Sequence, residues 1–413
     1  MKPLYKKIAR RLIPFLILLY AVAFLDRVNI SFAALTMNHD LGISESFYGF
    51  AAGVFFLGYC LFEVPANLML VRIGARRWLG LLQVVWGAVS VGTAFVPGRS
   101  DYILARCVLG VVEAGFFPGV IYYLTLWLPR PVRARMMALF LMALPVCNSL
   151  GSPISANILL LDHVAGLRGW QWLFILEGSP AILLGIATWL VLADNPWSAG
   201  WLSEDEKNQL AREMRADEAL DRPADSRIHL HIARDSVTYL MMNIGIYGFT
   251  FWIPKILVAG GMTATATGWW AALPYCVGAV AMLLASRRSG TRLMAANFLV
   301  CAAGFCLAAA SHSLPVSLAG FCLAAMGGYA ALPMFWSACT ARMSGKVAGA
   351  GIATVNSLGV FGGFVGPYAI GWLRDATHSY AVGLWAIAAC LVLGAVSASG
   401  GGARQEPAAQ LPR

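Results

Sequence analysis

Four ionisable residues lie inside otherwise apolar stretches of this 413-residue chain and could do chemistry there. Asp26 and Arg27 are adjacent in "AVAFLDRVNISFAAL", and Arg106 and Glu113 stand seven residues apart. Seven residues are about two helical turns, so Arg106 and Glu113 share one helix face. A guanidinium makes strong, often bidentate hydrogen bonds to a carboxylate. A carboxyl group can take up and release a proton. The four residues therefore suggest a site that binds an anion and handles protons.

Each pair also has a purely structural interpretation. Asp26 and Arg27 could form an ion pair within their helix, and Arg106 and Glu113 could form a lock within one bundle. Neighbours on a helix point about 100° apart, so Asp26 and Arg27 compensate each other only partly and can face different partners. Two further acids in apolar stretches, Glu63 and Glu177, are interpreted as packing or gating residues.

The composition explains why these charges stand out. The chain is 59% hydrophobic and only 12% charged, and its mean hydropathy is +0.70, whereas soluble domains are about a quarter charged. A bilayer-spanning helix needs about 20 apolar residues, and on that basis we expect twelve spans. They cover roughly 13–35, 47–70, 79–97, 101–126, 136–160, 171–193, 236–258, 267–286, 292–311, 315–341, 347–372 and 380–399. A charge near the bilayer centre costs about 2.5–3.5 kcal/mol, which favours a functional role.

The basic residues predict the orientation. With twelve spans, 24 of the 30 Lys and Arg residues fall on the side that holds both termini, and only Arg99, Arg168, Lys255 and Arg374 fall on the other. Cytoplasmic loops are enriched in Lys and Arg, so both termini are expected in the cytoplasm of a multi-pass protein of the cell inner (plasma) membrane. The net charge of +10 then reflects topology, and we expect no nucleic-acid binding.

One long polar insertion divides the spans six and six. We expect an N-terminal six-helix bundle at 1–193, a cytoplasmic linker at 194–235, and a C-terminal six-helix bundle with a short tail at 236–413. Ser203 and Glu206 have capping-box spacing, which predicts a short helix in the linker. Two short basic turns, "RIGARRWLG" and "SRRSGTRLM", occupy equivalent places in the two halves. Such repeated halves are typical of secondary transporters, which bind substrate between the halves at the midplane.

Several segments carry a resemblance to a known family. They are "FLDRVNISFAAL", "GYCLFEVPANLMLVRIGARRW", "ARCVLGVVEAGFFPGVIYYL", "YGFTFWIP", "ALPMFWSACTARMSG" and "GIATVNSLGVFGGFVGPYAIGWLRD". In this order they resemble the anion:cation symporter family of the major facilitator superfamily, and in particular bacterial permeases for tartrate, phthalate and related organic acids. The resemblance implies an all-α membrane protein with twelve transmembrane helices in two pseudo-symmetric halves.

The resemblance and the residues together predict a substrate site. Matching to sugar-acid permeases implies that Trp336 and Asn356 face the substrate, and the same matching suggests Tyr59 and Asn148. Tyr247 stands one turn from Asn243 in a span rich in family likeness. With Arg27 and Arg106 added, the expected site is cationic in the N-terminal half and neutral and hydrogen-bonding in the C-terminal half.

These residues predict a transporter rather than an enzyme. Arg27 and Arg106 would bind an organic-acid anion, and Asp26 and Glu113 would carry the coupling protons of a symport by alternating access. We expect a monomer in the bilayer with no cofactor and no metal. The alternatives are a sodium-coupled or electrogenic carrier, a sensor without flux, and an intramembrane enzyme. Neither a compact cluster of carboxylates and hydroxyls for sodium nor a nucleophile–base pair for catalysis is evident in the sequence.

Overall fold

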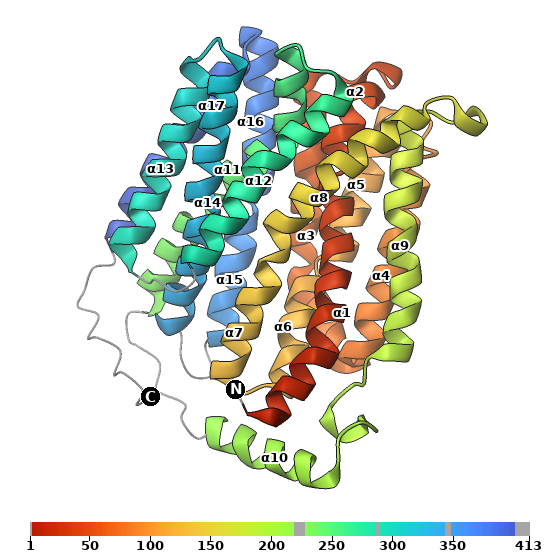
Figure 1. Cartoon of the computed structure of the whole chain (residues 1–413), viewed down its shortest axis with the longest axis vertical. Helices are drawn as coiled ribbons and strands as arrows, with labels where there is room; N and C mark the ends of the chain where they lie inside the picture. The colour runs from red at the N-terminus through yellow and green to blue at the C-terminus, as the bar shows by residue number, and fades with distance from the viewer. Residues whose placement is uncertain (1, 219–227, 286–289, 343–347, 401–413) are drawn as a thin grey trace.

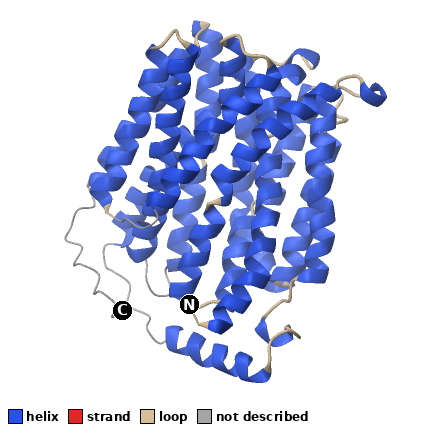
Figure 2. Cartoon of the chain, viewed as in Figure 1, coloured by secondary structure: helices blue, strands red, loops and turns tan. Residues whose placement is uncertain are grey.

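The structure is a computed structural model that describes residues 2–218, 228–285, 290–342 and 348–400. Within these ranges the regular structure is entirely helical and contains no strand, as Figure 2 shows. The expectation of an all-helical protein is therefore confirmed. The linker residues 219–227, the turn at 286–289 and the tail after 400 lie outside the described residues.

The helices before the linker form the N-terminal half, and those after it form the C-terminal half. The N-terminal half holds α1 (Pro3–Val28), α2 (Ile30–Asp40), α3 (Glu45–Ile73), α4 (Ala75–Thr93), α5 (Arg99–Glu113), α6 (Phe116–Trp127), α7 (Arg130–Leu141), α8 (Ala143–Ile158), η1 (Leu159–Leu161), η2 (Val164–Gly166) and α9 (Gly169–Val191). The linker holds η3 (Pro196–Ser198) and α10 (Glu204–Glu218). The C-terminal half holds α11 (Ile228–Ala259), α12 (Ala264–Ala285), α13 (Thr291–Ala310), α14 (Leu314–Arg342), α15 (Ala348–Val360), α16 (Gly362–Thr377) and α17 (Tyr380–Ser399).

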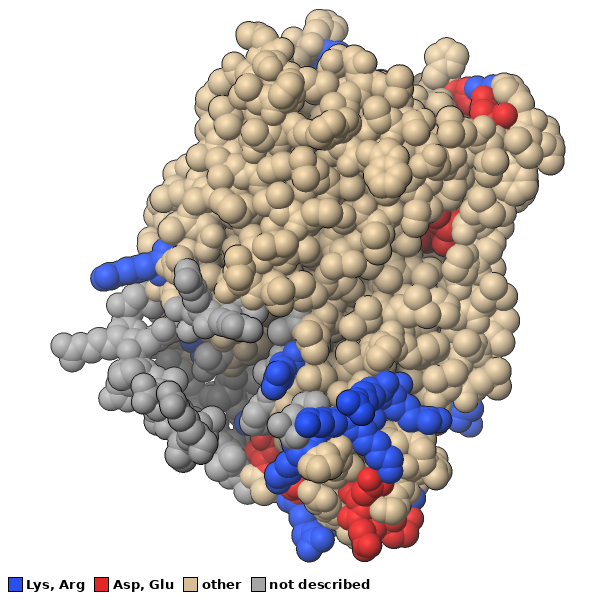
Figure 3. All heavy atoms as spheres, in the orientation of Figure 1, with Lys and Arg blue, Asp and Glu red and all other residues tan. Residues whose placement is uncertain are grey.

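The long helices run side by side, and the chain's first residues lie at the same end of the bundle as α10 (Figure 1). Lys and Arg side chains gather at that end, while the long sides of the bundle are almost free of charge in the view of Figure 3. Among the described residues, ten helices or continuous helix pairs are long and apolar enough to span a membrane. The two other expected spans correspond to α4, whose first turn contains Arg76 and Arg77, and to the broken pair α15–α16.

Four expected spans are each divided into two helices, and proline explains two of the breaks. Pro118 and Pro145 have no N–H to donate to the carbonyl four residues earlier, so the helix is interrupted between α5 and α6 and between α7 and α8. Gly362 and Gly363 follow the break between α15 and α16. The break between α1 and α2 falls at Asn29, without a proline or glycine there. The breaks after α1 and α5 closely follow Asp26, Arg27 and Glu113 in the chain.

The two halves are packed against each other at the end opposite α10, which we call the far end. Glycines permit this close approach of α3 and α16: a Cβ at Gly53 would lie 2.7 Å from the Phe364 ring, and one at Gly49 would overlap the Pro367 carbonyl. Polar contacts add to the closure, since Glu45 forms an ion pair with Lys255. The backbone N–H of Ser46 also donates to Asp375 at 2.8 Å.

The linker helix is fixed to the N-terminal half at the other end. Ser203 and Glu206 form the predicted capping box, with the two hydrogen bonds at 2.9 and 3.3 Å, so the expected linker helix is confirmed. Glu213 accepts hydrogen bonds from Lys2 at 2.8 Å and from Tyr5 at 2.5 Å. Burial raises the pKa of Glu213, but the hydrogen bonds from Lys2, Tyr5 and Gln209 outweigh it and lower that pKa to about 2.

Candidate functional site

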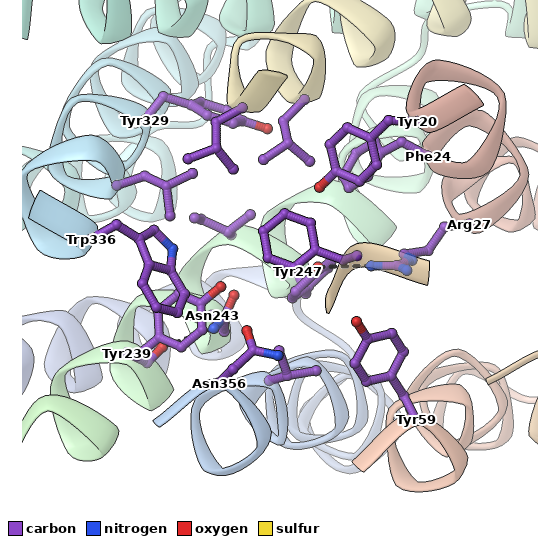
Figure 4. Close-up of a pocket in the computed structure, with 16 residues that line it drawn as sticks. Tyr20, Phe24, Arg27, Tyr59, Tyr239, Asn243, Tyr247, Tyr329, Trp336 and Asn356 are labelled. Carbon is purple, nitrogen blue, oxygen red and sulfur yellow. Dashed lines mark hydrogen bonds between the residues drawn. The ribbon is translucent and has the colours of Figure 1, made fainter. Parts of the chain in front are cut away.

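A cavity of about 50 Å³ lies between the two halves. Figure 4 shows Tyr20, Phe24, Arg27 and Tyr59 of the N-terminal half on one side, and Tyr239, Asn243, Tyr329 and Trp336 of the C-terminal half on the other. Sixteen residues line the cavity in all, and the other eight are Phe117, Leu141, Leu144, Ile246, Tyr247, Leu332, Asn356 and Val360. A volume of this size admits only a few waters, so the cavity suits a small solute and has to widen around it.

Arg27 is the charged residue of the cavity lining. It comes from the last turn of α1, and its Nε and Nη2 both donate to Oε2 of Glu113, at 3.1 and 2.5 Å. Its Nη1 donates to the hydroxyl of Tyr247 across the interface at 3.4 Å, as the dashed line in Figure 4 marks. The guanidinium therefore bridges an acid of its own half and a phenol of the other half.

The second arginine lies behind this pair. Arg106 is 1% exposed, and none of its three guanidinium nitrogens has a hydrogen-bond partner in the described part of the chain. The Phe55 ring is in cation–π contact with both arginines, with its centroid 4.9 Å from Cζ of Arg27 and 5.2 Å from Cζ of Arg106. Cation–π contact of this kind favours a desolvated guanidinium by about 2 kcal/mol. The charge of Arg106 also acts on Asp26 and Glu113.

Asp26 points away from the cavity into a polar cluster. Its Oδ1 accepts from the Ser90 hydroxyl of α4 and from the Asn29 amide at 3.1 Å. On the neighbouring α9, Glu177 accepts from the Ser155 hydroxyl of α8 at 2.6 Å. The structure thus gathers two carboxyl groups and two hydroxyls in a place that the sequence did not reveal, although no group of three or more His, Cys, Asp or Glu side chains suited to a metal ion occurs among the described residues. The two acids stand 151 positions apart in the sequence, and helix packing brings them near enough to interact electrostatically.

The opposite wall is neutral and rich in hydrogen-bonding groups. Tyr239, Asn243 and Tyr247 follow one another at four-residue intervals and share one face of α11. The Asn243 amide donates to the carbonyls of Tyr239 and Gly359 at 3.0 and 3.1 Å. Trp336 packs edge-on against Tyr239, with ring centroids 5.1 Å apart. This wall can align a polar solute without offering it a second charge.

Asn356 joins the halves below the cavity. Its amide donates to Oε1 of Glu63 at 2.7 Å, and the neighbouring Ser357 hydroxyl donates to Oε2 of the same carboxylate. Glu63 is 1% exposed, so both of its oxygens are satisfied inside the protein. The Glu63 carboxylate thus accepts the hydrogen bond that the Asn356 amide would otherwise donate to a substrate.

The structure brings five of the seven predicted substrate residues to the cavity: Arg27, Tyr59, Tyr247, Trp336 and Asn356. Asn148 is not among the lining residues, although its amide donates to the lining Tyr329 hydroxyl at 3.2 Å. Arg106 is also outside the lining. Of the two predicted proton carriers, Glu113 reaches the cavity through Arg27, while Asp26 turns toward the cluster with Ser90.

Sequence reasoning missed several lining residues, among them Tyr20, Phe24, Tyr239 and Tyr329. Helical spacing held a usable signal, because Tyr20 and Phe24 precede Arg27 by seven and three positions and therefore share its face. Tyr329 precedes Trp336 by seven positions in the same way. Once one residue of a helix is assigned to the cavity, this spacing identifies its neighbours.

Comparisons with known proteins identify the family and the fold. Residues 16–367 match the sequence profile of the Major Facilitator Superfamily. The chain is 42% identical over 401 residues to an Agrobacterium vitis protein named "Putative tartrate transporter", covering 95% of this chain and 89% of that protein. It is 35% identical over 402 residues to the "Inner membrane transport protein RhmT" of Escherichia coli, covering 95% and 93%. A crystal structure of a bacterial homologue of the lysosomal transporter Spinster, inward-facing and occupied, shares the fold at 18% identity, with a TM-score of 0.78 and coverage of 99% and 100%.

Proposed function

The chain belongs to the Major Facilitator Superfamily and is a multi-pass membrane transporter, and we propose that it imports a small organic carboxylate together with protons. The observation that carries the proposal is the Arg27–Glu113 pair at the cavity wall. A guanidinium at a cavity between two halves is suited to a carboxylate. A buried acid that shares this guanidinium gives a physical means of linking anion binding to proton binding.

The linkage follows from competition for one cation. While Glu113 is ionised, its Oε2 accepts from both Nε and Nη2 of Arg27, and a substrate carboxylate would have to displace it. A proton on Glu113 removes that competing charge and releases the guanidinium toward the cavity. Proton and anion therefore favour each other's binding, and the coupling acts equally in both directions.

The proposed substrate is a small, polar organic acid such as tartrate. The hydroxyls and amides of Tyr59, Tyr247 and Asn243 suit the hydroxyl groups of such an acid, and the relative from Agrobacterium vitis carries tartrate in its name. Arg106 is proposed as a second positive charge that the anion meets when the cavity widens. Tyr59, Asn148, Tyr247, Trp336 and Asn356 would complete the site, directly or through Tyr329.

The proposed cycle is alternating access between the two halves, with the termini in the cytoplasm and the far end facing outward. Support for this orientation comes from the basic side chains around α10 (Figure 3) and the positive-inside rule. The far-end contacts of Glu45 with Lys255 and of Ser46 with Asp375 would open to admit substrate. The units 1–193, 194–235 and 236–413 are proposed as the two moving bundles and their linker.

Uptake of radiolabelled tartrate into proteoliposomes tests the proposal. An acidic exterior should stimulate uptake, and a protonophore should abolish the stimulation. Uptake that needs a sodium gradient and resists the protonophore would refute proton coupling and support the sodium-coupled alternative. Absence of tartrate counterflow and of binding by any organic acid in a thermal-shift screen would refute the carboxylate assignment.

A further inference from the structure

The polar cluster behind Arg27 has a chemistry that the proposed mechanism leaves unused. It contains two carboxyl groups, Asp26 and Glu177, which are 0% and 6% exposed, with Asn29 at 0% exposure beside them. The cluster joins four helices, because Ser90 comes from α4 and Ser155 from α8. It lies behind the cavity, since none of these residues is part of the cavity lining.

Hydrogen-bond accounting shows that the cluster has more acceptors than donors. The Ser90 hydroxyl and the Asn29 amide donate to Oδ1 of Asp26, and the Ser155 hydroxyl donates to Oε1 of Glu177. Three fully buried oxygens then have no donor among the described residues: Oδ2 of Asp26, Oε2 of Glu177 and Oδ1 of Asn29. Asn29 is the most informative residue of the cluster. Its side-chain amide group interacts with both acids, but its own Oδ1 accepts no hydrogen bond from any described residue.

The charged groups around the cluster do not supply the missing hydrogen-bond donors. The charged group that acts on Glu177 is Asp26 of α1, and α4 and α8 contribute the uncharged Ser90 and Ser155. At its outer end α9 is tied to Asp40 of α2, which accepts from the Trp170 indole at 2.9 Å, about two turns from Glu177. Asp26 in turn feels the charges of Glu113 and Arg106. Two ionised acids in this cluster would have the charge of Arg106 to offset their repulsion, but Arg106 makes no hydrogen bond to either of them, and such an arrangement is costly in a buried site.

We propose that Asp26 and Glu177 form a carboxyl pair that binds one proton between them, with Asn29 as the bridging amide. The bound proton is an O–H donor for one of the orphaned acceptor oxygens. The pair has a net charge of −1 while it holds this proton and −2 once it has released it, so the proton is taken up from one side of the membrane and returned to the other. Glu177 thereby becomes a proton-handling residue of the transport cycle, which rests on the proton coupling proposed above. It acts through Asp26 and does not touch the substrate.

Infrared titration of the purified full-length protein in liposomes tests the pair without any substrate. The C=O band of protonated carboxyl groups should persist at neutral pH in the wild type and should lose intensity in Glu177→Gln. Ser155→Ala removes a hydroxyl that stabilises the ionised form of Glu177, so the pair should hold its proton to higher pH. The matched control is Glu63→Gln, an equally buried acid whose two oxygens are already satisfied by Asn356 and Ser357.

The same variants in proteoliposomes give the functional measurement, with radiolabelled tartrate as the probe. Glu177→Gln removes the negative partner of Asp26, so the external pH for half-maximal uptake should move about one pH unit toward acid. In Ser155→Ala it should move toward alkaline pH, and Glu177→Asp should restore a value near that of the wild type. A residue that only packed the helices would not produce shifts of opposite sign.

The outcomes separate this inference from the proposed function. If wild-type uptake responds to the pH gradient but neither the carboxyl band nor the midpoint moves in the Glu177 and Ser155 variants, the inference fails alone. If the band behaves as expected but tartrate uptake does not depend on the pH gradient, the carboxyl pair is supported as a proton-binding site and its role in transport is refuted. A band change in Glu63→Gln equal to that in Glu177→Gln would also overturn the assignment.

Discussion

Nη2 of Arg27 lies 2.5 Å from Oε2 of Glu113, and this contact joins residues that are 86 positions apart on α1 and α5. The carboxylate is 1% exposed, while the guanidinium reaches the cavity between the two halves. One cation is thus shared between an internal acid and the space open to a solute. The proposed coupling of anion and proton is built on this single contact.

Arg27→Gln should weaken carboxylate binding. A charge-assisted hydrogen bond is worth about 1.5–3 kcal/mol, so the dissociation constant should rise about 10- to 150-fold. The measurement is equilibrium binding of tartrate to folded, purified protein. Arg168→Gln is the matched control: it removes an arginine that pairs with Asp40 outside the cavity lining and should leave the dissociation constant unchanged. Wild-type affinity in Arg27→Gln would exclude Arg27 as the anion ligand.

Glu63 and Asn356 should behave as an interacting pair. Either alanine substitution leaves the other polar group buried without its partner, so the double variant should cost less stability than the sum of the two. A double-mutant cycle on the free energy of unfolding in detergent should give an interaction of about 0.5–3 kcal/mol. Tyr59→Phe, one turn from Glu63 on α3, serves as the comparison and should combine additively with Asn356→Ala. Strict additivity of Glu63→Ala with Asn356→Ala would show that the 2.7 Å contact carries no energy.

Gly49→Val should loosen the far-end closure. A side chain at this position meets the Pro367 carbonyl of α16, so the packed arrangement of α3 against α16 becomes less favourable. A cysteine introduced at Ser46 should then react faster with a maleimide when Gly49 is replaced by Val than when Gly49 is kept. Gly92→Val is the control, because no atom lies within 4 Å of a Cβ at Gly92. Equal labelling rates in the two valine variants would contradict closure at this contact.

The contacts of Glu213 with Lys2 and Tyr5, which hold α10 to the N-terminal half, should not respond to pH in the physiological range. Because hydrogen bonds lower the pKa of Glu213 to about 2, below its ordinary value of about 4.3, its contribution to stability is present above the ordinary value. That contribution is lost only as pH falls toward 2. Glu213→Gln should therefore leave the pH midpoint of uptake unchanged between pH 5 and 8. A shifted midpoint in Glu213→Gln would place a pH sensor in α10.

The helical fold and the charged residues of the site could be predicted from the sequence. Asp26, Arg27, Arg106 and Glu113 stand out because a charge is costly in an apolar span, and that rule needs no knowledge of packing. The residues at helical intervals from Arg27, such as Phe24, were also within reach of sequence reasoning. Ser203 and Glu206 predicted the start of α10 correctly because capping depends on local spacing alone.

The partnerships between helices could not be predicted. Spacing suggested that Arg106 and Glu113 share a helix face, yet Glu113 bonds with Arg27 from another helix. Glu63 accepts a hydrogen bond from Asn356 of the other half, and Asp26 of α1 interacts electrostatically with Glu177 of α9. Such pairings depend on how far and at what angle helices approach, which is set by packing throughout the bundle rather than by local sequence.

Glu113→Gln tests the central claim most directly, because glutamine has the shape of the protonated acid and cannot release a proton. The variant should bind tartrate at least as well as the wild type, since Arg27 no longer faces an ionised competitor. It should exchange tartrate when the substrate is present on both sides of the membrane. Uphill accumulation driven by a pH gradient should be lost. Normal pH-driven accumulation in Glu113→Gln would contradict the account and leave the Arg27–Glu113 contact as a structural ion pair.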